Sequence, residues 1–89
     1  MSGYRVRVHR RARRELSSAP AWIRGRVAKL ILDLATDPLH EDWDIGELHG
    51  EKGVFRIRIG EYRIVYRVDE VDRVVSIERV SPRGNAYVD

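Results

Sequence analysis

Apolar and polar positions alternate most clearly between Val54 and Val68, where the chain reads VFRIRIGEYRIVYRV. Strict alternation over two segments of this length predicts strands with one buried face. Gly60 and Glu61 lie between the segments, and a glycine at the first central position suits a two-residue type II′ turn. We therefore expect a β-hairpin whose short turn fixes which residues lie opposite each other.

This register sorts the side chains of the hairpin onto two faces. The apolar face is expected to contain Phe55, Ile57, Ile59, Tyr62, Ile64 and Tyr66. The other face is expected to carry Arg56, Arg58, Arg63 and Arg67. Arg58 and Arg63 are predicted to lie directly opposite each other, where like charges are destabilising. A solvated strand face is one explanation; clustered arginines on one face are also typical of a site for a polyanion such as nucleic acid.

The residues before the hairpin predict one strand and two helices. Residues 4–8 alternate as YRVRV, the pattern of a half-buried strand. Residues 9–17 predict a short helix with Ala12 and Leu16 facing inward. Residues 20–36 show a longer helical period, with an apolar stripe of Ile23, Val27, Leu30, Ile31 and Leu34. We expect the two helices to form a hairpin packed on one face of the sheet.

Residues 39–53 are polar and acidic, and we expect an irregular connection with Trp43 and Leu48 anchored in the core. The spacing of the carboxylates and imidazoles matches no metal-binding loop, so no metal site is predicted. Residues 74–80 predict a third strand of the meander, in which Glu78 is placed to neutralise one arginine. Arg79 falls on the apolar side of this strand, so it lies beyond the core or follows a bulge.

The element order predicts an α+β domain that spans residues 1–89. An N-terminal strand and a two-helix hairpin precede a three-stranded antiparallel meander, with helices on one face and a basic face left open. The sequence has no cysteine, no apolar run near the length of a membrane span and no signal-peptide pattern, which favours a cytoplasmic protein. Its 17 basic residues comprise 15 arginines and two lysines. No cofactor is expected.

Two motifs resemble the RelE/ParE superfamily of toxins from type II toxin-antitoxin systems. They are Leu48-His49-Gly50 and the hairpin segment from Phe55 to Tyr66, and the likeness extends over essentially the full chain. Arg83 and Tyr87 resemble the ending common in the RelE branch. The resemblance implies the RelE-like, microbial-ribonuclease-like sheet of that family.

The RelE branch implies a ribosome-dependent endoribonuclease, an mRNA interferase that cuts the message in the A site. A ribose 2′-OH would attack the neighbouring phosphate. By motif, the catalytic residues carried over are Arg56, Arg58, Arg63, Arg83 and Tyr87. The RNA-binding residues are Arg56, Arg58, Arg63, Arg67 and Arg83. The implied partners are a cognate antitoxin, the 70S ribosome and mRNA, with DNA reached only through the toxin-antitoxin complex.

One departure from the family pattern keeps other functions open. Pro82 occupies the position before Arg83 where many relatives have His or Lys, which removes a possible general acid. A ParE-type inhibitor of DNA gyrase without catalytic activity is one alternative, and a decayed toxin that only binds its antitoxin is another. His49, just before the hairpin, is a candidate substitute acid or base.

Overall fold

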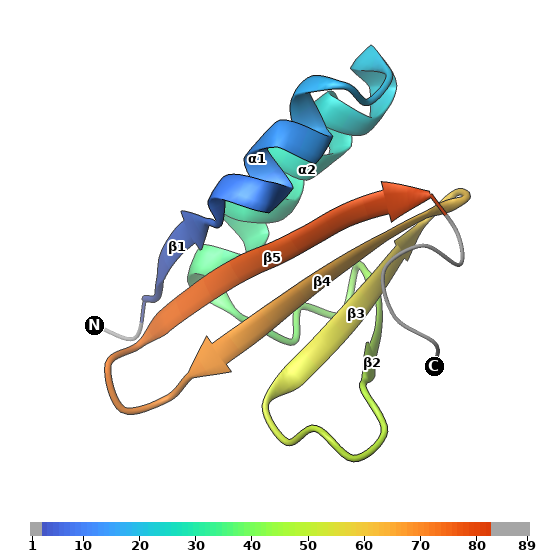
Figure 1. Ribbon diagram of the computed structural model, residues 1–89. Helices are drawn as coiled ribbons and strands as arrows, with labels where there is room; N and C mark the ends of the chain where they lie inside the picture. Colours follow the sequence, from blue (N-terminus) through green and yellow to red (C-terminus); the bar gives the residue numbers. More distant parts are fainter. Residues whose placement is uncertain (1–2, 83–89) are drawn as a thin grey trace.

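The structure, a computed structural model, describes residues 3–82 and consists of two helices packed on one face of a five-stranded mixed sheet (Figure 1). The elements in chain order are β1 Arg5–Val8, α1 Arg10–Ser17, α2 Ala21–Thr36, β2 Asp44–Glu47, β3 Val54–Ile59, β4 Tyr62–Asp69 and β5 Val74–Pro82. The strand order is β1-β5-β4-β3-β2, with β1 parallel to β5 and the other pairs antiparallel. The predicted α+β class, with helices on one face, is confirmed.

The β3–β4 hairpin has the predicted register at all six pairs, from Val54 opposite Arg67 to Ile59 opposite Tyr62. Gly60 has a φ of 61°, while Glu61 is not among the residues with positive φ, which agrees with a type II′ turn. A Cβ at Gly60 would also lie 2.8 Å from Cη2 of Trp22. Both the turn and the close approach of Trp22 therefore require glycine.

Both predicted helices form within a residue or so of their expected limits. The ring of His9 caps α1, because its Nδ1 accepts the Arg11 N–H at 3.3 Å. Pro20 occupies the N-cap of α2, one position before the first helical residue. Along α2, Ile23, Val27, Leu30 and Leu34 are fully buried, whereas Ile31 is only half-buried.

The expectation that residues 39–53 lack regular structure was wrong at Asp44–Glu47, which forms the edge strand β2. Its sequence, DIGE, contains a single apolar side chain, so no alternation reveals it. Pairing with β3 creates the strand, with Asp44 opposite Arg58 and Gly46 opposite Arg56. The tertiary context therefore decides the conformation of this segment.

The last strand is longer than predicted and contains a bulge. β5 continues past Val80 to Pro82, which is tolerated because β1 pairs only with residues 74–77 and leaves this end of β5 as an edge. The register shifts between Val65 and Tyr66, which lie opposite Arg79 and Ile77. The bulge explains how Arg79 avoids the core, one of the two predicted possibilities.

Helix α1 stabilises the exposed end of β5 through Glu15. The carboxylate of Glu15 accepts the Val80 backbone N–H at 2.7 Å and lies 2.9 Å from Nη2 of Arg79. The Arg79 and Glu15 side chains are only 14% and 22% exposed. Glu15 thus supplies the partner for a backbone donor that β1 does not reach.

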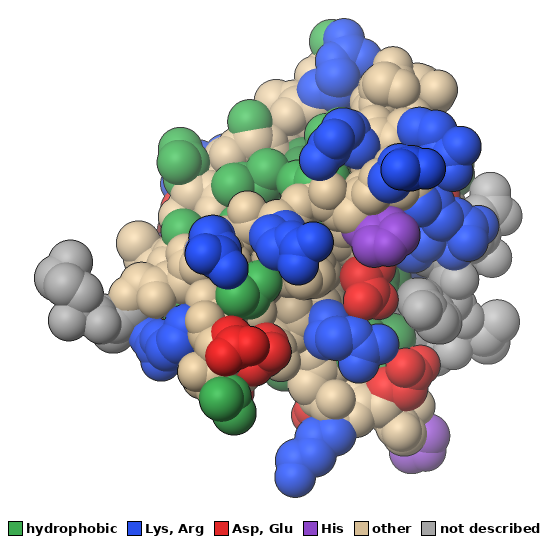
Figure 2. Space-filling view, turned by 60° about the vertical axis from the view of Figure 1, so that its left-hand side comes forward, with side chains coloured by type: hydrophobic (Ala, Val, Ile, Leu, Met, Phe, Trp, Pro, Cys, Tyr) green, Lys and Arg blue, Asp and Glu red, His purple; other side chains and the backbone are tan. Residues whose placement is uncertain are grey.

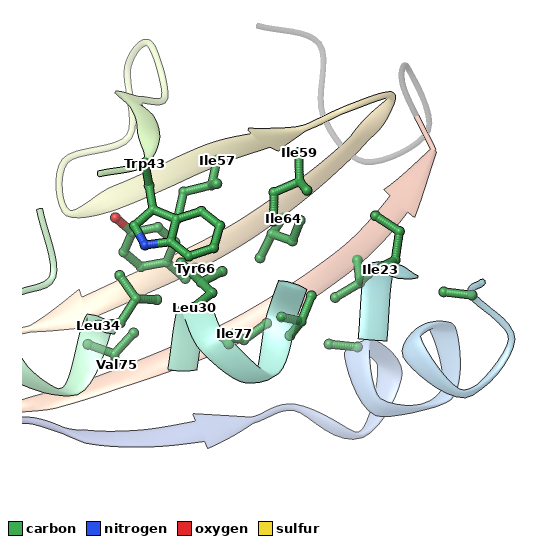
Figure 3. Packing of buried hydrophobic residues seen from close by; sticks show 14 residues of the cluster. Ile23, Leu30, Leu34, Trp43, Ile57, Ile59, Ile64, Tyr66, Val75 and Ile77 are labelled. Atoms are coloured by element: carbon green, nitrogen blue, oxygen red, sulfur yellow. The ribbon is translucent and has the colours of Figure 1, made fainter. Parts of the chain in front are cut away.

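The main core lies between α2 and the sheet, where side chains from the two layers interdigitate (Figure 3). Tyr66 is fully buried, stacks on Phe55, and donates its hydroxyl hydrogen to the Pro38 carbonyl at 2.5 Å. Trp43 is buried as predicted, and its Nε1 donates to Asp33 at 2.8 Å. This contact fixes the start of the connection that leads into β2.

Leu48 is buried as predicted, but it lies outside the main core in a small separate cluster with Val54 and Val65.

Within residues 3–82, neither helix combines the length and the apolar character needed to cross a membrane.

Candidate functional site

The face of the sheet opposite the helices carries the four arginines predicted there, Arg56, Arg58, Arg63 and Arg67, and we call it the arginine face. The alternation of β3 and β4 sends their apolar side chains into the main core and leaves these arginines on the other side. Their surroundings nevertheless differ, and the four side chains have different freedom to meet a ligand.

Arg58 and Arg63 form the most open part of the arginine face. They lie directly opposite each other at the turn end of the hairpin. Arg58 is exposed and Arg63 is half-buried, and together with Gly60, Glu61 and Tyr62 they line a hollow of about 310 Å³. Two guanidinium groups beside one hollow form a binding geometry for an anion, because each offers a planar fork of donors.

The row of residues that contains this arginine pair continues onto both neighbouring strands. Asp44 of β2 lies opposite Arg58, and Ser81 of β5 lies opposite Arg63. The Ser81 hydroxyl is buried and has no hydrogen-bond partner among the residues that the structure describes. A carboxylate and a hydroxyl therefore flank the two guanidinium groups, and neither was part of the predicted site.

Arg56 is held inside the sheet rather than projecting from it. Its side chain is only 18% exposed, and Nη1 lies 3.9 Å from a carboxylate oxygen of Asp44. The guanidinium lies over Gly46, its partner on β2. Sequence reasoning missed Gly46, because it stands ten residues from Arg56 in a segment predicted to be a loop.

Arg67 is paired with a carboxylate. Its Nε lies 3.1 Å from Oε2 of Glu78, as the sequence predicted for Glu78. The Arg67 side chain is 51% exposed, so the pair is on the surface and salt will screen it. Arg67 therefore brings less net positive charge to the arginine face than Arg58.

The structure separates His49 from the arginine pair. His49 is exposed and lines a hollow with neighbouring loop residues before β3, whereas Arg58 lies near the other end of that strand. The strand from Val54 to Arg58 spans about 13 Å at the usual rise per residue. His49 is therefore not part of the Arg58–Arg63 hollow.

Arg83 and Tyr87 lie outside the residues that the structure describes, and their roles remain predictions. The last described residue, Pro82, lies opposite Tyr62 at the end of β5. This is the same end of the sheet as the hollow between Arg58 and Arg63.

Positive charge also extends away from the arginine face onto β1 and α1. Arg7 of β1 is exposed and lies opposite Ser76, which in turn lies opposite Arg67. Helix α1 adds four exposed arginines, Arg10, Arg11, Arg13 and Arg14. Figure 2 shows this side of the molecule, with Lys and Arg side chains gathered over the upper part, where the helices lie. Such a basic surface is suited to a long polyanion.

Comparison with known proteins places the chain in a family. Residues 6–87 match the family described as the ParE toxin of the type II toxin-antitoxin system parDE. The chain is 35% identical to the putative toxin RelE1 of Methanocaldococcus jannaschii, over 94% of each protein. It belongs to the RelE/ParE superfamily of type II toxins.

Other relatives of this toxin fall in the RelE branch. Toxin RelG of Mycobacterium tuberculosis is 37% identical, over 94% of this chain and 95% of that protein. A chain in the crystal structure of the archaeal RelE-RelB complex from Pyrococcus horikoshii superposes with a TM-score of 0.81 and 32% identity. That match covers 97% of this toxin and 100% of the other chain. The protein is a RelE-like toxin, as its motifs indicated.

Proposed function

We propose that this toxin is a ribosome-dependent endoribonuclease that cuts mRNA in the A site. The observation that carries the proposal is the pair of opposed arginines, Arg58 and Arg63, beside an open hollow on the arginine face. The stability of the free protein gains nothing from two like charges placed directly opposite each other. A phosphate between the two guanidinium groups would turn this repulsion into binding.

The reaction is attack of a ribose 2′-OH on the adjacent phosphate, which breaks the bond to the 5′-oxygen of the next nucleotide. It needs a base for the 2′-OH, positive charge at the phosphate and a proton for the leaving oxygen. Arg58 and Arg63 supply the charge. Neither serves as the base, because a guanidinium stays protonated in proteins.

Arg83 and Tyr87 have further roles in this proposal. Arg83 holds the phosphate together with Arg63, through bidentate contacts. Tyr87 transfers a proton or stacks on a base of the message. A tyrosine has an ordinary pKa of about 10, so a phenolate base requires the nearby arginines to lower the pKa of Tyr87. Pro82 provides no acid, so the leaving 5′-oxygen takes its proton from water, which limits the rate of this proton transfer.

The toxin acts in the cytoplasm, where it meets translating 70S ribosomes. The exposed arginines of β1 and α1 support ribosome binding, because ribosomal RNA is a dense polyanion. A cognate antitoxin is the second partner, by analogy with the RelE-RelB complex of Pyrococcus horikoshii. An acidic antitoxin segment that covers the arginine face would block the site, and DNA contacts would come from the antitoxin.

Inhibition of DNA gyrase is the second candidate function, because the family that matches residues 6–87 is described as ParE toxin. Under this function the arginine face binds a protein or DNA without chemistry. A decayed toxin that retains only antitoxin binding is the third candidate. The ending with Arg83 and Tyr87 favours cleavage, and assays of RNA cleavage and of gyrase supercoiling separate the three functions.

Growth arrest in cells tests the proposal with single alanine variants. Arg63→Ala, Arg83→Ala and Tyr87→Ala are each expected to abolish toxicity while the circular dichroism spectrum stays unchanged. Lys52→Ala is the matched control, because Lys52 is an exposed cation in the loop before β3, away from the Arg58–Arg63 hollow. Full toxicity in all three site variants would remove the ribonuclease proposal.

A further inference from the structure

Gly46 of β2 lies unusually close to the guanidinium of Arg56. A Cβ built on Gly46 would stand 2.8 Å from Nη2, 2.9 Å from Cζ and 3.1 Å from Nη1 of Arg56. Real Cβ atoms essentially never approach a non-bonded atom within 3.0 Å. The guanidinium therefore occupies the space that a side chain at position 46 would need.

The backbone gives no other reason for a glycine at this position. The described glycines with positive φ are Gly50, Gly53 and Gly60, and Gly46 is not among them. A glycine inside a strand is destabilising relative to alanine, because it loses more conformational freedom on folding. Strand glycines often mark a close approach of other groups. At Gly46 that group is the guanidinium of Arg56.

We infer that Gly46 is a positioning residue that holds the charge of Arg56 flat against β2. Asp44, two residues before Gly46 on the same strand, places a carboxylate oxygen 3.9 Å from Nη1 of this guanidinium and attracts it. The position of the charge is thereby fixed relative to Arg58, which is two residues further along β3, or about 7 Å.

The arginines of the site would then have different roles in RNA binding. This assignment of roles rests on the proposed function. Arg58 and Arg63 line the hollow, where the phosphate that reacts would bind. Arg56 supplies a fixed charge beside them for the neighbouring stretch of the RNA backbone. A group held in place beforehand stabilises a transition state without the cost of ordering it during the reaction.

Gly46→Ala tests the inference, with Gly25→Ala as the matched control. A Cβ at Gly25 meets no atom within 4 Å, so the control makes the same change in open space. In Gly46→Ala the clash is with the end of a flexible side chain, so the fold is expected to remain and Arg56 to move. The first measurement is the NMR signal of the Arg56 Nε–H and its exchange with water, in the free toxin.

The Arg56 signal is expected to shift and to exchange faster in Gly46→Ala, and to stay unchanged in Gly25→Ala. An Arg56 signal that is identical in the wild type and Gly46→Ala would overturn the positioning role. This NMR measurement does not depend on whether the toxin cleaves RNA. An unchanged Arg56 signal would therefore refute the positioning role without bearing on the proposed function.

The second measurement is kcat and KM for ribosome-dependent cleavage, for each variant alone and combined with Arg56→Lys. Gly46→Ala is expected to lower kcat/KM by roughly 10- to 100-fold, the size of effect that a misplaced group produces. Lysine lacks the planar guanidinium group that a Cβ at position 46 would displace. In the Arg56→Lys background, Gly46→Ala should therefore have little further effect on kcat/KM.

An equal loss in both backgrounds would show that Gly46 does not act through Arg56, and an unchanged kcat/KM in Gly46→Ala would equally overturn the catalytic role. If the wild-type toxin cleaves no message, the proposed function fails and the catalytic part of the inference fails with it.

Discussion

Arg58 and Arg63 lie directly opposite each other across β3 and β4, and Asp44 lies opposite Arg58 on the other side of β3. Such a pair raises the free energy of the free protein, and the two-residue turn at Gly60 allows no other register. We propose that a ligand that carries negative charge compensates this repulsion. A mutation that removes one arginine of this pair should therefore stabilise the free protein and impair its function.

Arg58→Thr is expected to stabilise the free toxin while it impairs cleavage. Threonine suits an exposed strand position and removes the repulsion, which is worth about 0.2–1 kcal/mol in the free energy of unfolding. Urea unfolding at low and high salt measures the gain, which should shrink at high salt because salt screens the pair. A less stable variant, or one that cleaves at the wild-type rate, would contradict the role given to Arg58.

Glu15→Ala is expected to destabilise the fold. It removes the acceptor for the Val80 N–H and the carboxylate that contacts the largely buried Arg79. Loss of charged hydrogen bonds of this kind costs about 1.5–3 kcal/mol. Glu15→Gln keeps an oxygen for Val80 and should cost less. Equal unfolding midpoints in urea for Glu15→Ala and the wild type would show that α1 does not support the end of β5.

Tyr66 is expected to make the stability depend on pH under alkaline conditions. Burial, and secondarily the charge of Asp37, raises the pKa of the Tyr66 hydroxyl above its usual value of 10.0. Above pH 10 the unfolded chain therefore binds fewer protons than the folded protein. Stability is complete below pH 10 and falls as pH rises, by about 1.4 kcal/mol per pH unit from this group.

Tyr66→Phe provides the comparison for that pH dependence. It keeps the ring that stacks on Phe55 but leaves the Pro38 carbonyl without its donor, which costs about 1–3 kcal/mol at neutral pH. Urea unfolding at pH 7 and pH 11 should show a smaller loss of stability with pH in the variant. The same loss in both proteins would exclude Tyr66 as its source.

The arginines of α1 are expected to contribute to ribosome binding. The double variant Arg10→Glu and Arg14→Glu reverses two exposed charges of α1. Its affinity for ribosomes should fall, and the dependence of log K on log salt should become shallower by about one for each phosphate that the variant no longer neutralises. Co-sedimentation with ribosomes at several salt concentrations measures both. Unchanged binding would restrict the ribosome contact to other surfaces.

Local patterns were sufficient to predict the hairpin and both helices. The turn at Gly60 fixed six residue pairs, and therefore the arginine face, without knowledge of the rest of the fold. Arg79 on the apolar side of its strand left two explanations open, a position beyond the core or a bulge, and the structure shows the bulge. The alternation of the last strand predicted that Glu78 neutralises one arginine, and the structure shows that this arginine is Arg67.

The missed features depend on contacts between segments far apart in the sequence. Strand β2 has no pattern of its own and forms because β3 offers it a partner. The contact between Gly46 and Arg56 cannot be seen before that pairing is known. The link from Glu15 to Val80 joins residues 65 positions apart. Sequence patterns thus located the charges of the site, and tertiary structure decided which of them are fixed.

Primer extension on a message that is being translated in a purified system tests ribonuclease activity most directly. The wild-type toxin is expected to produce new 5′ ends within codons only when ribosomes are present, and Arg63→Ala to produce none. Gyrase supercoiling is assayed in parallel on the same sample. Absence of cuts together with blocked supercoiling would contradict the ribonuclease function and assign the toxin to gyrase inhibition. Inactivity of a folded sample in both assays would indicate a decayed toxin.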